Sequence, residues 1–476
     1  MIKTSTFKLV NKLDQKQIIL IGVNMNLIRT CLITMLIVLN TIVITAQEKQ
    51  LPYKNDPVIL EKIKNLGDRQ GLRLPNPKIM SSGKILKTPY RGGPYSRDYT
   101  NKMVHAPERE SALYCGGNHG SGRTNDVWEY HLGSNTWHRL HAPIGGDHAK
   151  HKLMLQFMRR QWKKNLNKKF NEKEQKQFDA AKSFWKKYVV FKDGHCVTKI
   201  GEAPLMVGHT WDTLVYEPNV GLLIQGTGAH CGGGALNQHK FGDMPLDVIK
   251  KTIGKNSKGI PYKSMWTFDP IKKKWGHYAS NDKLARLRGM GAAMCYIPEW
   301  KKIIFYVSAQ NVTPQAHMMI TYDAINDKWA NLRPNNGRSI RDLVHKDKVA
   351  PSSEQQTAYS SKHKKMYAIL KSDLFCYDIL SNKWTKLCTD KRIYGHDAKT
   401  IFAYDSVGDV LILAGPRQKT QFAIYDIKSN KWEVFKPTGS KMTREPWGEG
   451  KGYYDPKHNV FVLHNKGLWL YRHKKK

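Results

Sequence analysis

Histidine, arginine and tyrosine side chains occur in this chain in a combination that suits proton transfer beside a carboxylate. His119 stands in Gly-Gly-Asn-His-Gly, and His209 stands in Val-Gly-His-Thr-Trp-Asp. Either imidazole could act as a base near neutral pH. Arg288 or Arg444 would neutralise the carboxylate, and Tyr394 would protonate the leaving oxygen. Together these roles make up a β-elimination.

Further residues beside these positions would contact the substrate, namely Trp211, His230, His396 and Trp447. The chain has 19 histidines, so several would lie near any site, and a His after Gly-Gly can simply cap a turn. A zinc site built from His209, His230 and Cys231 is conceivable, because nitrogen and sulfur ligands suit zinc. The spacing does not require it. We therefore predict no metal site and no cofactor, and leave zinc or calcium open.

Five repeated hairpins would position these side chains. Residues 422–435 read Phe-Ala-Ile-Tyr-Asp-Ile-Lys-Ser-Asn-Lys-Trp-Glu-Val-Phe, which predicts two short strands around a polar turn. Tyr425 and Trp432 stand seven residues apart in it. The same gap separates the aromatic residue and the Trp in four other hairpins, Tyr130–Trp137, Phe268–Trp275, Tyr322–Trp329 and Tyr377–Trp384. Such a pattern indicates a repeat protein.

A second pair of strands precedes most of these hairpins, so each unit has four strands. Examples are Tyr296-Ile-Pro-Glu-Trp-Lys-Lys-Ile-Ile-Phe and Tyr404-Asp-Ser-Val-Gly-Asp-Val-Leu-Ile-Leu. Four-stranded units of about 50 residues are typical of β-propeller blades. The pair Gly116-Gly117 and the spaced Tyr and Trp residues resemble the kelch family over residues 110–476. We predict an all-β, kelch-like β-propeller of six to seven four-stranded blades with a helical insertion.

The last unit ends at Leu468-Trp-Leu-Tyr-Arg and lacks a Trp strand. Kelch-like propellers close the ring with a strand from the other terminus, so the resemblance implies that an irregular lead-in, residues 47–108, supplies it. Six units are visible, and a seventh could lie in residues 60–108. The predicted organisation is a signal peptide at 1–46, the lead-in at 47–108 and the propeller at 109–476.

Propeller ligands usually meet the mouth of the central channel, at the starts of the inner strands and in the adjoining loops. We expect each inner strand to begin about seven residues before the first Tyr of its unit. This expectation brings the candidate residues that precede these strands to one face, namely His209, Arg288, His396 and Trp447. His119 and His230 follow second strands and would join them there.

The N-terminus has the layout of a signal peptide. The 16 residues 31–46 form an apolar run behind Arg29, and the chain turns polar at Gln47. This run is short for a membrane span, which needs about 20 residues. We expect cleavage after Ala46 and a secreted or periplasmic protein without membrane attachment. An uncleaved anchor is the alternative, because Ile44, two residues before Ala46, is a poor residue for a cleavage site.

The chain is strongly basic, with 78 Lys and Arg against 39 Asp and Glu, a formal charge of +39. The predicted signal peptide holds five Lys or Arg and one Asp, which leaves +35 on the mature chain. Such a surface attracts polyanions. For an exported protein we expect an acidic polysaccharide that contains uronate, with or without sulfate, and not nucleic acid. Generic solubility is the alternative explanation of the charge.

Residues 150–190 interrupt the repeat with a basic helical insertion. Asn171-Glu-Lys-Glu174 is a capping-box signature, and Phe178, Ala181 and Trp185 follow it at helical spacing. A polyanion-binding arm is one interpretation, and a helix laid against the propeller with a solvated Lys face is the other. Elsewhere, Cys376 and Cys388 are equidistant from Asn382, so we predict that they face each other across the repeat hairpin, where export would permit a disulfide.

The His, Tyr and Arg residues, by type and expected location, resemble those of propeller lyases such as the ulvan lyases, which cleave uronate-containing sulfated polysaccharides. The resemblance implies a polysaccharide lyase, and we expect a monomer. A non-catalytic kelch-type propeller that binds carbohydrate or protein is the alternative, because a fold does not determine a function.

Overall fold

The computed structural model describes Thr30 and most of the chain after residue 50. The described ranges are 51–85, 93–95, 97, 100–117, 124–146, 169–192, 195–204, 207, 210–225, 265–278, 293–306, 319–336, 356–370, 372–393, 400–415, 421–442, 450–465 and 467–476. The chain divides into Met1–Pro52 and Tyr53–Lys476. The predicted signal peptide at 1–46 lies outside the described residues except for Thr30.

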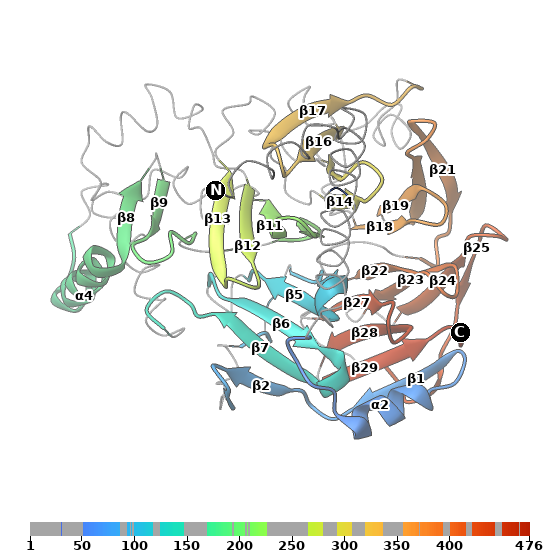
Figure 1. Cartoon of the computed structure of the whole chain (residues 1–476), viewed down its shortest axis with the longest axis horizontal. Helices are drawn as coiled ribbons and strands as arrows, with labels where there is room; N and C mark the ends of the chain where they lie inside the picture. Colours follow the sequence, from blue (N-terminus) through green and yellow to red (C-terminus); the bar gives the residue numbers. More distant parts are fainter. Residues whose placement is uncertain are drawn as a thin grey trace, which may run out of the picture. The chain divides into compact units, whose positions relative to one another are not determined.

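Residues 53–476 form a six-bladed β-propeller (Figure 1). The predicted all-β propeller with four-stranded blades is confirmed, and the described residues hold six blades and no seventh. Blade 1 consists of β4 (Val104–Ala106), β5 (Ser111–Cys115), β6 (Val127–His131) and β7 (Thr136–His141). Blade 2 consists of β10 (Leu214–Glu217), β11 (Gly221–Gln225), β12 (Met265–Asp269) and β13 (Lys274–Tyr278). Blade 3 consists of β14 (Ala293–Ile297), β15 (Lys302–Tyr306), β16 (Met319–Asp323) and β17 (Lys328–Leu332).

Blades 4 to 6 repeat this order from the inner strand outward. Blade 4 consists of β18 (Gln356–Ser360), β19 (Lys365–Leu370), β20 (Asp373–Asp378) and β21 (Lys383–Thr389). Blade 5 consists of β22 (Ile401–Asp405), β23 (Val410–Gly415), β24 (Gln421–Asp426) and β25 (Lys431–Val434). Blade 6 consists of β27 (Lys451–Asp455), β28 (Val460–Asn465), β29 (Gly467–Arg472) and a strand from the N-terminal lead-in. Each junction between neighbouring blades buries one apolar cluster, so the six blades close into a ring.

The repeated hairpins pair as the seven-residue spacing predicts. Tyr425 lies directly opposite Trp432, and each of the four other aromatic residues also faces its Trp. The Asp after the aromatic residue holds the turn, as when Asp378 Oδ1 accepts hydrogen bonds at 2.9 Å from the amides of Leu380 and Ser381. Asn382 ends this turn with φ +50°, where Asn is tolerated better than most residues.

The tyrosine hydroxyl fixes the same turn from the other side. Tyr377 donates to Asn382 Oδ1 at 2.5 Å, and Tyr130 donates to Asn135 Oδ1 at 2.9 Å, in each case five residues ahead. Where the repeat carries Phe268 instead of Tyr, the residue five positions on is Lys273, which offers no acceptor. The aromatic position and the position five residues on therefore vary together. The repeat has Tyr at the first where the second offers a side-chain acceptor, and Phe where it does not.

The lead-in closes the ring through β1 (Gln70–Leu74), which pairs antiparallel with β29 and parallel with β26 (Thr438–Gly439). Gly71 stands opposite Tyr471, where the other hairpins have Trp. A few residues later β2 (Lys78–Ser81) pairs parallel with β7, and β3 (Lys84–Ile85) pairs with β2. One N-terminal segment therefore binds the outer edges of blades 6 and 1 together.

The lead-in is more regular than the sequence predicts. It begins with α2 (Pro57–Lys64), whose N-cap Asp56 accepts a hydrogen bond from the amide of Val58. Its last strand, β4, is the inner strand of blade 1 and lies before the predicted propeller boundary at residue 109. The repeat pattern misses β4 because His105 stands where the other inner strands have Tyr. Two 3₁₀ turns, η1 (Pro107–Arg109) and η2 (Leu132–Ser134), complete this blade's turns.

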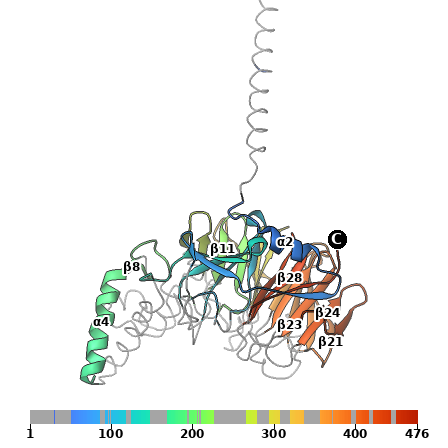
Figure 2. The same ribbon diagram turned by 90° about the horizontal axis from the view of Figure 1, so that it is seen from below.

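The predicted helical insertion is present between blades 1 and 2. Its described helix is α4 (Glu172–Tyr188) (Figure 2). This helix begins with the expected capping box between Asn171 and Glu174 and buries Phe178, Ala181 and Phe184. A two-stranded sheet of β8 (Val189–Lys192) and β9 (His195–Thr198) follows it. Residues 150–168 of the predicted insertion lie outside the described residues.

The prediction that Cys376 and Cys388 face each other across the hairpin is wrong, and both cysteines are free. Thr385 lies opposite Cys376, and Leu374 lies opposite Cys388. The turn is not centred on Asn382, and a bulge at Leu374 shifts the register further. The two thiols are therefore not cross-strand partners.

Two edges of the blades differ in the length of their connections. Turns of three or four residues join the first strand to the second and the third to the fourth, and we call this the turn edge. The inner strands begin at the opposite edge, which we call the loop edge because the long connections start and end there. The inner strands begin two or three residues before their Tyr, as β10 does before Tyr216, and not seven. The predicted start positions therefore fall in connections.

Buried histidines at the junction of blades 6 and 1 predict an acid-sensitive fold. His464 is 1% exposed and packs 4.2 Å from the Tyr130 ring and 4.8 Å from Trp137. Burial, and then Lys451, hold the pKa of His464 well below its ordinary value, and burial lowers the pKa of His131 and His138 to about 4. An unfolded His has a pKa of about 6.5, so the unfolded chain binds more protons below that pH.

Stability should therefore be complete above pH of about 6.5 and decline as the pH falls toward 4. We expect the free energy of unfolding in urea to drop by about 2–4 kcal/mol between pH 7.5 and pH 5. His464→Leu removes one of these groups and should flatten the dependence. Equal pH profiles for the wild type and this variant would contradict the role of His464.

Candidate functional site

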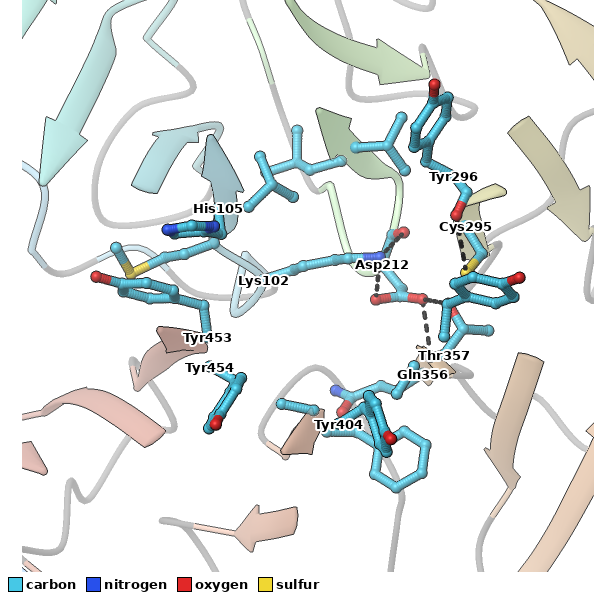
Figure 3. A pocket seen from close by; sticks show the side chains of 18 of the residues that line it. Lys102, His105, Asp212, Cys295, Tyr296, Gln356, Thr357, Tyr404, Tyr453 and Tyr454 are labelled. Carbon is cyan, nitrogen blue, oxygen red and sulfur yellow. Dashed lines mark hydrogen bonds and ion pairs between the residues drawn. The ribbon is translucent and has the colours of Figure 1, made fainter. Parts of the chain in front are cut away.

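A cavity of about 410 Å³ runs along the central channel and is lined by the inner strands of all six blades (Figure 3). Its walls come from short runs around β4, β10, β14, β18, β22 and β27. These strands lie next to the axis because each is the first strand of a four-stranded meander. Residues from every blade therefore meet in this channel.

A largely buried ion pair crosses the channel near the starts of the inner strands, with the Lys102 side chain 20% exposed and that of Asp212 5% exposed. Lys102 Nζ, from the segment before β4, lies 2.9 Å from Asp212 Oδ1 and donates to the Met294 carbonyl at 2.8 Å. Asp212 Oδ2 in turn accepts hydrogen bonds from Thr357 N at 2.9 Å and Thr357 Oγ1 at 2.5 Å. Figure 3 shows Lys102 reaching toward Asp212. These contacts join blades 1, 2, 3 and 4.

Two carboxamides join the other side of this layer. Asn101 Nδ2 and Gln356 Nε2 both donate to the carbonyl of Thr400, just before β22. Gly452 of blade 6 exchanges backbone hydrogen bonds with Asn101 and Met103 at 3.1 Å. We call the group Asn101, Lys102, Asp212, Gln356, Thr357 and Thr400 the polar plug. It ties inner strands of all the blades together.

The electrostatics of the channel follow from burial. Burial raises the pKa of Asp212, and the Lys102 ammonium and the Thr357 hydrogen bonds oppose this change. Burial raises the pKa of Cys295 to about 12, so this thiol stays protonated and is not a nucleophile at neutral pH. Burial also lowers the pKa of His105, which keeps its imidazole neutral. Among the described lining residues, Lys102 and Asp212 therefore form an internally balanced ion pair.

Tyrosines line the channel further toward the turn edge. His105 of blade 1 takes the position that tyrosine holds in the other five inner strands: Tyr216, Tyr296, Tyr359, Tyr404 and Tyr454. Tyr404 donates to Asp409 Oδ1 at 2.8 Å and Tyr454 to Asn459 Oδ1 at 2.8 Å, so these hydroxyls fix turns. His105 stacks on Tyr453 with ring centroids 6.1 Å apart.

Most residues predicted for the site lie outside the described residues. These are His119, His209, His230, Arg288, Tyr394, His396, Arg444 and Trp447. Trp211 is described, and it is 2% exposed with φ +44°, so its ring is packed inside the protein. The roles predicted for these nine residues therefore stay predictions.

The described strands nevertheless show which connections carry these residues. They belong to the connections β5–β6, β7–β10, β11–β12, β13–β14, β21–β22 and β25–β27. All six connections begin and end at the loop edge, because each follows a second or a fourth strand. The flanking strand ends thus share one edge of the propeller. None of the short turns that join strands at the turn edge contains one of the nine predicted residues.

Sequence reasoning missed the polar plug. Lys102, Asp212 and Thr357 are far apart in the chain, and their spacing matches no known motif. Asp212 ends the segment Val-Gly-His-Thr-Trp-Asp, and its place just before an inner strand is the one feature that could have indicated it.

Within the described ranges, no group of three His, Cys, Asp or Glu side chains could hold a metal ion. Nor does any helix in that part of the chain have the length and apolar character to span a membrane. The chain matches no model of a known protein family and no curated protein, so its architecture and the geometry of its channel are the basis for a functional assignment.

Proposed function

We propose that the protein is an exported lyase that binds an acidic polysaccharide at the loop edge and cleaves it by β-elimination. The observation that carries this proposal is that nine His, Arg, Tyr and Trp candidates, spread over residues 119–447, all belong to connections at one edge of the blades. Loops held by a rigid scaffold are where binding and catalytic residues concentrate.

The charge of these connections supports a polyanionic substrate. The β7–β10 connection, residues 142–213, holds 15 Lys and Arg against seven Asp and Glu. The β11–β12 connection, residues 226–264, holds six Lys against two Asp. Basic surface of this kind raises the local concentration of an anionic chain.

The reaction needs no group beyond the side chains. His119 or His209 would remove the C5 proton of a uronate residue while Arg288 or Arg444 holds its carboxylate. The electron pair forms the C4–C5 double bond, and the bond from C4 to the leaving oxygen breaks. Tyr394 would give a proton to that oxygen. The products are a shortened chain and a fragment with an unsaturated end.

The test is incubation of the mature protein with ulvan, alginate, pectin and glycosaminoglycans. The unsaturated ends should raise the ultraviolet absorbance with at least one of them. We expect His119→Ala or His209→Ala to lower kcat by at least about 100-fold, the usual contribution of a general base. His363→Ala is the matched control, because His363 lies in a turn at the turn edge and pairs with Asp409 at 2.7 Å.

Salt dependence separates electrostatic capture from the chemistry. Binding of the same polysaccharides should weaken steeply between 50 mM and 500 mM salt, because added ions screen exposed charges. Binding without unsaturated products would assign the loop edge to a non-catalytic propeller. Neither binding nor products with any polymer would reject the proposal.

A further inference from the structure

Two buried oxygen atoms of the polar plug lack hydrogen-bond partners among the described residues. They are Asn101 Oδ1 and Gln356 Oε1, on side chains that are 3% and 5% exposed. Both amide nitrogens are occupied by the Thr400 carbonyl, so each oxygen faces away from that bond. Leaving one such acceptor unpaired costs about 1–3 kcal/mol. Both residues line the channel cavity.

The cavity is reached from the turn edge. Its lining includes Ser361 and Ser406, which are exposed and lie in turns after inner strands. At its other end the lining consists of polar-plug residues, and Asp212 and Thr357 there are only 4% and 5% exposed. Exposure therefore rises from the polar plug to the turn edge, so the polar plug is the floor of a pocket.

The walls favour a neutral ligand. The described charged lining groups, Lys102 and Asp212, neutralise each other, and the Lys102 ammonium disfavours a cation near the floor. His105 Nε2 is also buried and has no partner among the described residues. Tyrosine rings and partly satisfied polar groups around a cavity of about 410 Å³ match the usual make-up of small-molecule sites.

We propose that the channel binds a small neutral hydroxylated molecule of monosaccharide size, which enters from the turn edge and donates hydroxyls to Asn101 Oδ1 and Gln356 Oε1. The tyrosine rings would pack against its carbon skeleton. This site is at the opposite end of the channel from the predicted catalytic loops and takes a different class of ligand. It stands or falls independently of lyase activity.

The test is saturation-transfer NMR and calorimetry with D-glucose, D-galactose, L-rhamnose, D-xylose and myo-inositol on the full mature chain. At least one should bind, and Gln356→Met should weaken its binding at least tenfold, because methionine keeps the length of the side chain but removes the acceptor. Asn336→Leu is the matched control, since Asn336 Oδ1 is equally unpaired in the described part of the chain but does not line the cavity.

Thermal unfolding of each variant checks that it is folded. Asn101→Leu should act as Gln356→Met does. No binding by any of the five molecules would overturn the proposal and leave the two oxygens to water only. Equal loss in Asn336→Leu, or binding that survives both channel variants, would also overturn it.

Discussion

Gly71→Val should open the ring and be the most destabilising single change on the N-terminal segment. A Cβ atom at Gly71 would lie 2.5 Å from the Ser440 carbonyl oxygen and 2.7 Å from Trp469 Nε1. Neither neighbour can move freely, because Trp469 Nε1 donates to that same carbonyl at 2.7 Å. The Trp469 side chain is also fixed by packing, since the residue is 1% exposed in the core between blades 5 and 6. Overpacking alone costs about 1–3 kcal/mol.

Displacing β1 also removes its pairing with β29 and β26, so we expect a loss of at least about 3 kcal/mol in the free energy of unfolding. The measurement is urea unfolding followed by tryptophan fluorescence. Gly67→Ala is the control on the same segment, because its new Cβ would meet only the movable end of the Gln70 side chain, at 3.0 Å. Equal stability of the two variants would show that β1 does not hold the ring closed.

Lys102→Met should destabilise the protein by about 3–5 kcal/mol, because it leaves a buried carboxylate without its cation. Asp212 is 4% exposed, and Thr357 alone would then stabilise its charge. Loss of Lys102 also removes its 2.8 Å hydrogen bond to the Met294 carbonyl, which keeps a longer one from Thr357 Oγ1 at 3.5 Å. Lys362→Met is the matched control, because its ion pair with Asp409 is 62% exposed on the lysine side and should contribute less than about 1 kcal/mol.

The pH dependence identifies the cause. Without Lys102 the folded pKa of Asp212 rises further, so the charged carboxylate opposes folding above its unfolded pKa of about 3.9. The difference in unfolding free energy between Lys102→Met and the wild type should therefore shrink as the pH falls toward 4. The double variant with Asp212→Asn should recover part of the loss at pH 7. A difference that stays constant with pH would indicate lost packing instead.

The sequence predicts the blades well because their hairpins are local. Tyr, Asp, an αL Asn or Asp and Trp lie within eight residues, so the spacing of Tyr377 and Trp384 already contains the register. The pattern fails where one position changes identity. His105 hides the inner strand of blade 1, and Gly71 hides the outer strand of blade 6. The spacing of Cys376 and Cys388 gives a wrong prediction because both are equidistant from Asn382, whereas the turn is not centred on Asn382.

The candidate site was less predictable because its contacts join distant parts of the chain. Lys102, Asp212 and Thr357 meet only after six blades have formed a ring, and no local spacing encodes that. The sequence alone indicates candidate His, Arg, Tyr and Trp residues, and the topology shows that the connections that contain them begin and end at the loop edge. The arrangement of side chains such as His119 and His209 depends on long connections that have no repeat to define them.

The pairing of β1 with β29 also sets an order of events during synthesis. β1 leaves the ribosome about 400 residues before its partner β29, since Gly71 pairs with Tyr471. Until then β1 has no antiparallel neighbour, and an unpaired strand is exposed to wrong pairings. The final blade therefore cannot form until β29 has been synthesised, and closure of the ring must wait for that strand. Pairing over so long a stretch of sequence makes closure a late and slow folding step.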